Sequence, residues 1–195
     1  MLKAVSALTT GCVDEYTPSR NCCSGDIALA TSLTSIASEA FYGCTITSVD
    51  FTGLSTLTSI GAGAFSNTLL TSISFEGLSS LTSIDGYAFS NTQLTSVSFV
   101  GLSSLTTIGD SAFYGTKLTS VSFEGLSSLN SIGINAFSNT LLSSVSFEGL
   151  SKLTSISKNA FSNTQLTTFN VLSHRLQIAT PSRGPYVRGV FHRRH

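Results

Sequence analysis

Serine is the most regularly placed residue in this sequence whose side chain could do chemistry. Pairs of serines recur every 24 residues in the tripeptide Ser-(Val or Ile)-Ser. They are Ser72 and Ser74, Ser96 and Ser98, Ser120 and Ser122, and Ser144 and Ser146. A serine hydroxyl becomes a nucleophile only beside a positioned base. Residues 27–170 contain no histidine, because His174, His192 and His195 all lie near the C-terminus. We therefore do not expect these serines to be nucleophiles. They either dock a partner or are simply small, soluble residues on an exposed face.

No other pattern in the chain predicts an enzyme. The sequence has no GxGxxG, Walker, HExxH or EF-hand motif. Charged residues make up only 10% of the 195 residues, whereas ordinary domains have about 25%. We expect a non-enzymatic protein with no cofactor and no small-molecule substrate.

The four cysteines cluster towards the N-terminus, at positions 12, 22, 23 and 44. Cys22 and Cys23 are adjacent, a spacing that common zinc sites do not use. We expect one or two disulfides or buried thiols, with a metal site as the alternative; disulfides would indicate an oxidising compartment.

Three glutamates share a position just after the serine pairs, namely Glu76, Glu124 and Glu148, and Val100 interrupts this column. A bound cation is conceivable there, but a solvated rim is the simpler interpretation. We expect no metal.

A strict 24-residue period positions all these residues. Phe51, Phe75, Phe99, Phe123 and Phe147 mark it, and six units follow one another without insertion over residues 27–170. Each unit reads as two extended segments, "LTSVSF" and "LTSIG…AF", the first ending with the alternation of a half-buried strand. One unit cannot bury its apolar side chains alone, but stacked units can. A second phenylalanine column should then form a buried ladder: Phe41, Phe65, Phe89, Phe113, Phe137 and Phe161.

Two further columns predict turns. One contains only Gly and Asn: Gly43, Asn67, Asn91, Gly115, Asn139 and Asn163. Another contains only Gly: Gly53, Gly77, Gly101, Gly125 and Gly149. These residues tolerate a left-handed backbone, so we expect positive φ at the first column and positive φ or close backbone approach at the second. Tyr87 lies in a variable column and is expected to be a solitary exposed aromatic residue.

The repeat pattern "LTSIGxxAFxxC/T…LTSVxF" resembles the BspA-like, or surface-antigen type, leucine-rich repeat family. Cys44 matches the position where that family commonly has Cys, and Thr replaces it in the later units. The family often has Pro after the strand, where this chain has "FEGL". The resemblance implies a β-rich leucine-rich repeat solenoid of six 24-residue rungs, with short parallel strands and little or no α-helix. It also implies adhesion to proteins or cells, and an extracellular or cell-surface location.

The sequence thus divides into three parts. Residues 1–26 form an N-terminal segment or cap with cysteines, residues 27–170 form the repeats, and residues 171–195 form a basic tail that we expect to be flexible. Five arginines and no acidic residue follow Asn170, so phosphate or anionic lipid contacts are conceivable. No stacking platform accompanies them, and we do not expect nucleic-acid binding. No apolar run is long enough for a membrane span, and the N-terminus is too short for a convincing signal peptide.

We expect the serine pairs to pave a concave sheet that docks a protein or cell-surface partner. Two alternatives remain open. The regular hydroxyl array could bind ice or another crystal surface, although Ser lacks the methyl group of Thr and a leucine-rich sheet usually curves. The repeats could also be a structural spacer without a dedicated ligand.

Overall fold

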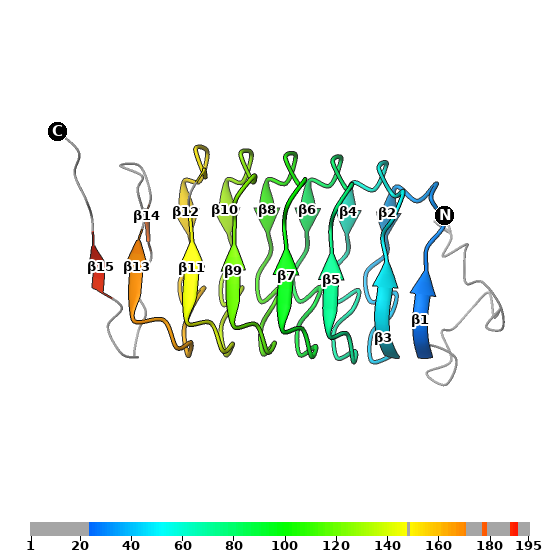
Figure 1. Ribbon diagram of the computed structural model, residues 1–195, viewed down its shortest axis with the longest axis horizontal. Coiled ribbons are helices and arrows are strands. Elements are labelled where there is room, and N and C mark those ends of the chain that lie inside the picture. The colour runs from blue at the N-terminus through cyan, green and yellow to red at the C-terminus, as the bar shows by residue number, and fades with distance from the viewer. Residues whose placement is uncertain (1–23, 148, 171–176, 179–187, 191–195) are drawn as a thin grey trace.

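The computed structural model describes residues 24–147, 149–170, 177–178 and 188–190. These residues form a parallel β-solenoid, and none of them is helical. Figure 1 shows two rows of strands along the long axis, one in front of the other. The front row consists of β1 (Ser24–Ala28), β3 (Thr45–Asp50), β5 (Ser72–Ser74), β7 (Ser96–Ser98), β9 (Ser120–Ser122), β11 (Ser144–Ser146), β13 (Thr168–Asn170) and β15 (Arg188–Val190). The rear row consists of β2 (Ser35–Ile36), β4 (Ser59–Ile60), β6 (Ser83–Ile84), β8 (Thr107–Ile108), β10 (Ser131–Ile132), β12 (Ser155–Ile156) and β14 (Gln177–Ile178).

All described strand pairs are parallel, and the pairing follows the repeat. In the front row Ser72 pairs with Ser96, and Ser74 with Ser98. In the rear row Ile60 pairs with Ile84. Equivalent residues therefore stack directly on one another, because each rung has the same length and the same apolar pattern. The expected β-rich solenoid with short parallel strands is confirmed.

The core contains two ladders of phenylalanines. In the ladder that includes Phe89, successive rings stack with centroids 5.0–5.3 Å apart. In the ladder that includes Phe99, the spacing is 5.4–5.9 Å. Each ring of one ladder meets the other edge-on, as Phe99 meets Phe113 at 5.8 Å and 81°. Stacked and edge-to-face contacts are the two favourable arrangements of aromatic rings, so the predicted ladder is confirmed.

The turns have the left-handed backbone that their residue types predict. Asn67, Asn91, Asn139 and Asn163 have φ of 53–58°, and the glycines of the same column have φ of 69–70°. The all-Gly column has φ of 80–90°.

A third left-handed column was not predicted, because it contains Glu, Tyr and Ser as well as Gly and Asn. It consists of Glu39, Gly63, Tyr87, Ser111, Asn135 and Asn159, with φ of 55–64°. Hydrogen bonds between rungs hold this conformation. The Tyr87 N–H, for example, donates to the Asp110 carbonyl at 2.8 Å, and the Glu39 N–H donates to the Ala62 carbonyl at 2.8 Å.

Threonines in the same column as Cys44 are buried and hydrogen-bonded. The Oγ1 atoms of Thr68, Thr92, Thr116 and Thr140 each donate to the carbonyl of the Phe three residues earlier, at 2.9–3.0 Å. Cys44 is buried at the equivalent position. A small side chain fills this place in either case, and the hydroxyl gains a partner that keeps its burial inexpensive.

The expectation of a concave sheet is wrong. The rungs superpose closely when seen along the stack, and Figure 1 shows the front strands in a nearly straight row. Helical outer segments wider than a strand would splay the rungs apart and bend the stack. Here both faces are extended backbone with one rung spacing, so little rotation accumulates from repeat to repeat.

Several expectations lie outside the described residues. These concern Cys12, Cys22 and Cys23, the three histidines, Glu148 and most of the basic tail. The division into three parts at residues 26 and 170 remains a prediction. Within the part that the structure describes, no helix is long and apolar enough to cross a membrane.

Candidate functional site

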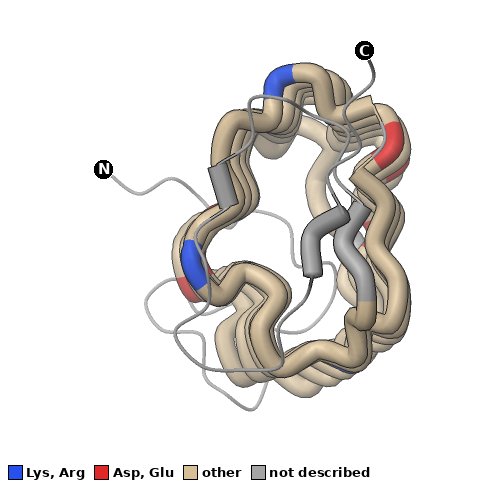
Figure 2. The backbone as a smooth tube through the Cα atoms, turned by 90° about the vertical axis from the view of Figure 1, so that its left-hand side faces the viewer, with Lys and Arg blue, Asp and Glu red and all other residues tan. Residues whose placement is uncertain are grey.

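The predicted serine pairs come together on one surface, which we call the serine face. It is formed by β5, β7, β9 and β11, which pair in that order within one sheet. All eight serines are exposed, whereas Ile73, Val97 and Val121 between them point into the core. Charged residues occur at only a few points around the rung (Figure 2).

The two serines of each pair differ in their hydrogen bonding. The second serine of the pair accepts a bond from the backbone two residues later, in a local turn. The Glu76 N–H donates to Ser74 Oγ at 3.3 Å, and the Glu124 N–H donates to Ser122 Oγ at 3.3 Å. Asp50 occupies the same column one rung earlier. It accepts a bond from the Thr52 N–H at 2.8 Å, and the Thr52 side chain and backbone together lower the pKa of its carboxyl group.

The first serine of each pair forms a separate set, which we call the first serine file. It consists of Ser72, Ser96, Ser120 and Ser144. Among the described residues, the structure shows no hydrogen bond to any of these four hydroxyl groups. Each hydroxyl is a donor and an acceptor, so the file presents four equivalent polar groups at the rung spacing.

A file of threonines just before the rear strands is different, because its hydroxyls are already engaged. Thr58 Oγ1 donates to the Thr34 carbonyl at 2.8 Å, Thr82 Oγ1 to the Thr58 carbonyl at 2.9 Å, and Thr106 Oγ1 to the Thr82 carbonyl at 2.9 Å. These threonines tie one rung to the next. The hydroxyls of this threonine file are therefore committed to the rung before, whereas those of the first serine file are not.

The carboxylates of the described residues do not assemble into a site. Glu76 and Glu124 are exposed, and between their rungs lies Val100, which is 63% exposed. No group of three or more His, Cys, Asp and Glu residues suited to a metal occurs in the described ranges. The predicted disulfides are not tested, because three of the four cysteines lie outside those ranges.

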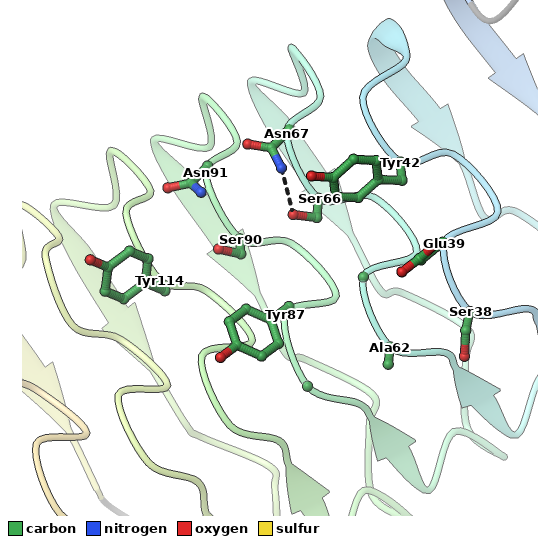
Figure 3. Close-up of a pocket in the computed structure, with 12 residues that line it drawn as sticks. Ser38, Glu39, Tyr42, Ala62, Ser66, Asn67, Tyr87, Ser90, Asn91 and Tyr114 are labelled. Atoms are coloured by element: carbon green, nitrogen blue, oxygen red, sulfur yellow. Dashed lines mark hydrogen bonds between the residues drawn. The ribbon is translucent and has the colours of Figure 1, made fainter. Parts of the chain in front are cut away.

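A second surface was missed by the sequence reasoning. The segments that lead from the rear strands towards the serine face line a groove of about 400 Å³. Tyr42, Tyr87 and Tyr114 lie around it, together with Asn67 and Asn91 (Figure 3). We call it the tyrosine groove. Tyr87 is therefore not solitary. One sequence feature could have indicated the groove: Tyr42 and Tyr114, three rungs apart, replace the serine that the other rungs have in the same column.

The sequence was also compared with known proteins. The model of the BspA type leucine-rich repeat region matches in 6 copies, over residues 19–140 and 58–181. The chain belongs to this family. This membership agrees with the 24-residue rung of the structure.

Three solved structures are similar to this chain at low sequence identity. A leucine-rich repeat protein from Bacteroides ovatus is 21% identical with a TM-score of 0.49, and the match covers 82% of this chain and 52% of that one. A leucine-rich cell surface protein from Faecalibacterium prausnitzii is 19% identical with a TM-score of 0.41, covering 86% and 60%. The pneumococcal vaccine antigen PcpA is 17% identical with a TM-score of 0.36, covering 80% and 58%. The chain thus spans between half and three-fifths of these proteins. No curated protein matches it.

Proposed function

We propose that the protein is a non-enzymatic interaction module that docks a protein or cell-surface partner on its serine face. The observation that supports this most directly is the first serine file, whose four exposed hydroxyl groups have no partner within the described chain. Exposed, uncommitted hydroxyls at one fixed spacing suit a partner that also presents repeated polar groups.

Adhesion is the role most consistent with the chemistry of this face. The eight serines lie in a nearly uncharged surface, which lacks the Trp, Tyr and Arg residues that anchor tight interfaces. One copy should therefore bind weakly, and many copies displayed together should bind well because linked binding events reinforce one another. A BspA-type repeat displayed on a cell surface would supply that multiplicity, so we also propose an extracellular or surface location.

The binding experiment uses the chain displayed in many copies on beads, tested against immobilised matrix glycoproteins and whole cells. The variant replaces Ser72, Ser96, Ser120 and Ser144 with Ala. The matched control replaces four exposed serines of another column with Ala: Ser55, Ser79, Ser103 and Ser127. We expect the first variant to lose retention on the beads and the control to keep it. Equal retention by both variants, or no retention of the unaltered chain, would contradict the proposal.

Location is tested separately by labelling intact, unpermeabilised cells with an antibody against the repeats. Surface labelling supports adhesion. Labelling that appears only after permeabilisation would remove its premise.

The straightness of the stack supports a second candidate, binding to ice or another crystal surface. A straight row of equivalent hydroxyls can match a lattice repeat, whereas a curved one cannot, so the predicted curvature no longer argues against it. The serines still lack the methyl groups of threonine. A thermal-hysteresis measurement on the unaltered chain and on the first-file variant tests this role, and the absence of hysteresis would reject it.

A further inference from the structure

We propose that the tyrosine groove is a binding site for a neutral oligosaccharide, with the sugar chain lying along the solenoid axis across several rungs. This site is separate from the serine face and does not depend on it.

The aromatic residues of the groove are the first argument. Tyr42 and Tyr87 are 46% and 56% exposed, and Tyr114 is partly buried. They are the tyrosines of the described chain, and they come from three different rungs, yet they border one groove (Figure 3). A single exposed aromatic residue needs no explanation. Three around one hollow provide flat apolar surfaces with a polar tip, which suit the alternating apolar and hydroxylated faces of pyranose rings.

The floor of the groove is rigid, which favours binding without a cost of ordering. Backbone N–H groups of one rung donate to carbonyls of the next along the whole groove. The Asn67 N–H donates to the Ser90 carbonyl at 2.8 Å, and the Asn91 N–H donates to the Tyr114 carbonyl at 2.7 Å. Tyr87 itself has φ of 59°, an uncommon value for a bulky residue. The same conformation recurs in the equivalent residues of the other rungs, so the main chain holds Tyr87 in a fixed position.

The amides of the groove supply the polar contacts. Asn139 and Asn163, in the same column outside the groove, bond to each other through their side chains at 3.0 Å. Asn67 and Asn91 do not pair in this way. The Asn67 amide donates only to Ser66 Oγ at 3.1 Å, and the Asn91 amide has no such bond within the described residues. Each amide therefore keeps donor and acceptor capacity, which matches a sugar hydroxyl.

The charge of the groove selects the class of sugar. Glu39 is the sole charged residue that lines it. Without Lys or Arg, the groove cannot neutralise sulfate, phosphate or sialic acid groups. A proline-rich peptide would also fit aromatic residues, but it presents few hydrogen-bond donors to the amide oxygens. Successive rungs are about 4.8 Å apart, close to the length of one hexose in an extended chain, so equivalent contacts can repeat sugar by sugar.

The experiment titrates the full chain with cellohexaose, laminarihexaose and mannohexaose, followed by calorimetry and by the side-chain amide signals of Asn in NMR spectra. Residues from sister rungs provide variants that the fold already accepts. Each substitution introduces the residue found at the equivalent position of another rung. These are Tyr87→Gly (Gly63), Tyr114→Ser (Ser138) and Asn91→Gly (Gly43). Asn139→Gly is the control, because it makes the same substitution outside the groove. Circular dichroism checks that each variant keeps the fold.

We expect at least one neutral hexaose to bind with a weak dissociation constant, on the order of millimolar or below. Tyr87→Gly and Tyr114→Ser should each weaken binding by about tenfold, from lost stacking. Asn91→Gly should weaken it several-fold, and Asn139→Gly should leave it unchanged. A sulfated hexaose should not bind.

The proposal is overturned if none of the neutral hexaoses binds at a concentration about ten times a millimolar dissociation constant. It is also overturned if the affinity is the same for the unaltered chain and the three groove variants. It is also overturned if a deca-proline peptide, and no sugar, shifts the groove signals. Loss of adhesion on the serine face has no bearing on these outcomes, because the first-file variant leaves every groove residue in place.

Discussion

Phe89 and Phe113 lie face to face in the centre of the solenoid, with ring centroids 5.3 Å apart and planes inclined by 12°. Both side chains are fully buried, and each has a further phenylalanine on its other face. This contact repeats through the ladder and makes each rung depend on its neighbours for stability.

Removal of a ring from the middle of the ladder should therefore be costly. We expect Phe113→Ala to lower the free energy of unfolding by about 3–5 kcal/mol, through lost burial and the cavity that remains. Urea unfolding followed by circular dichroism measures it. The nearby exposed Lys117 serves as the control, since Lys117→Ala should change stability by less than about 0.5 kcal/mol. Similar losses for both would mean that the ladder does not hold the stack together.

The left-handed turn at Asn91 predicts a different pair of effects. Its φ of 55° is accessible to Gly at no steric cost, whereas a β-branched side chain clashes there. We expect Asn91→Gly to keep the midpoint of thermal unfolding near that of the unaltered chain. Asn91→Val should lower the free energy of unfolding by more than about 1 kcal/mol. The assignment fails if the two variants unfold alike.

The buried hydroxyl of Thr116 should make stability depend on which residue occupies this position. Thr116→Val keeps the size of the side chain but leaves the Phe113 carbonyl without its 3.0 Å donor. We expect a loss of about 1–2 kcal/mol. Thr116→Cys should cost less stability, because Cys44 fills the equivalent position three rungs earlier. Chemical denaturation under reducing conditions compares them, and a Val variant as stable as the unaltered chain would argue against the hydroxyl's role.

The serine face predicts a separation of stability from binding. Ser98 and Ser122 accept long bonds of 3.5 Å and 3.3 Å from the following turn, so their Ala variants should lose a few tenths of a kcal/mol. Ser96→Ala and Ser120→Ala should leave stability unchanged and reduce retention by multivalent display. Thermal unfolding and bead retention, measured on the same four variants, check the division. Indistinguishable behaviour of the two files would remove the distinction between them.

The sequence predicts the parts of this fold that each rung repeats. Phe89 and Asn91 recur in columns of one residue type, so their burial and backbone conformation follow from the pattern. Ser72 and Ser74 look alike in the sequence, and their difference comes from local geometry, because only the second is two residues from a turn N–H. The straight axis depends on both faces having the same width, which no single column reveals. The groove requires four rungs to be placed side by side, because Tyr42, Tyr87 and Tyr114 come from two columns and from the first, third and fourth of these rungs.

The left-handed column of Tyr87 accepts Glu, Gly, Tyr, Ser and Asn in successive rungs while its backbone angle hardly changes. The conformation there is fixed by contacts between main chains, so the side chain is free to vary. Each duplication of a unit therefore creates one more position where a new surface can arise by a single substitution, without any rebuilding of the scaffold. A family built this way can diversify what it recognises while its architecture stays constant.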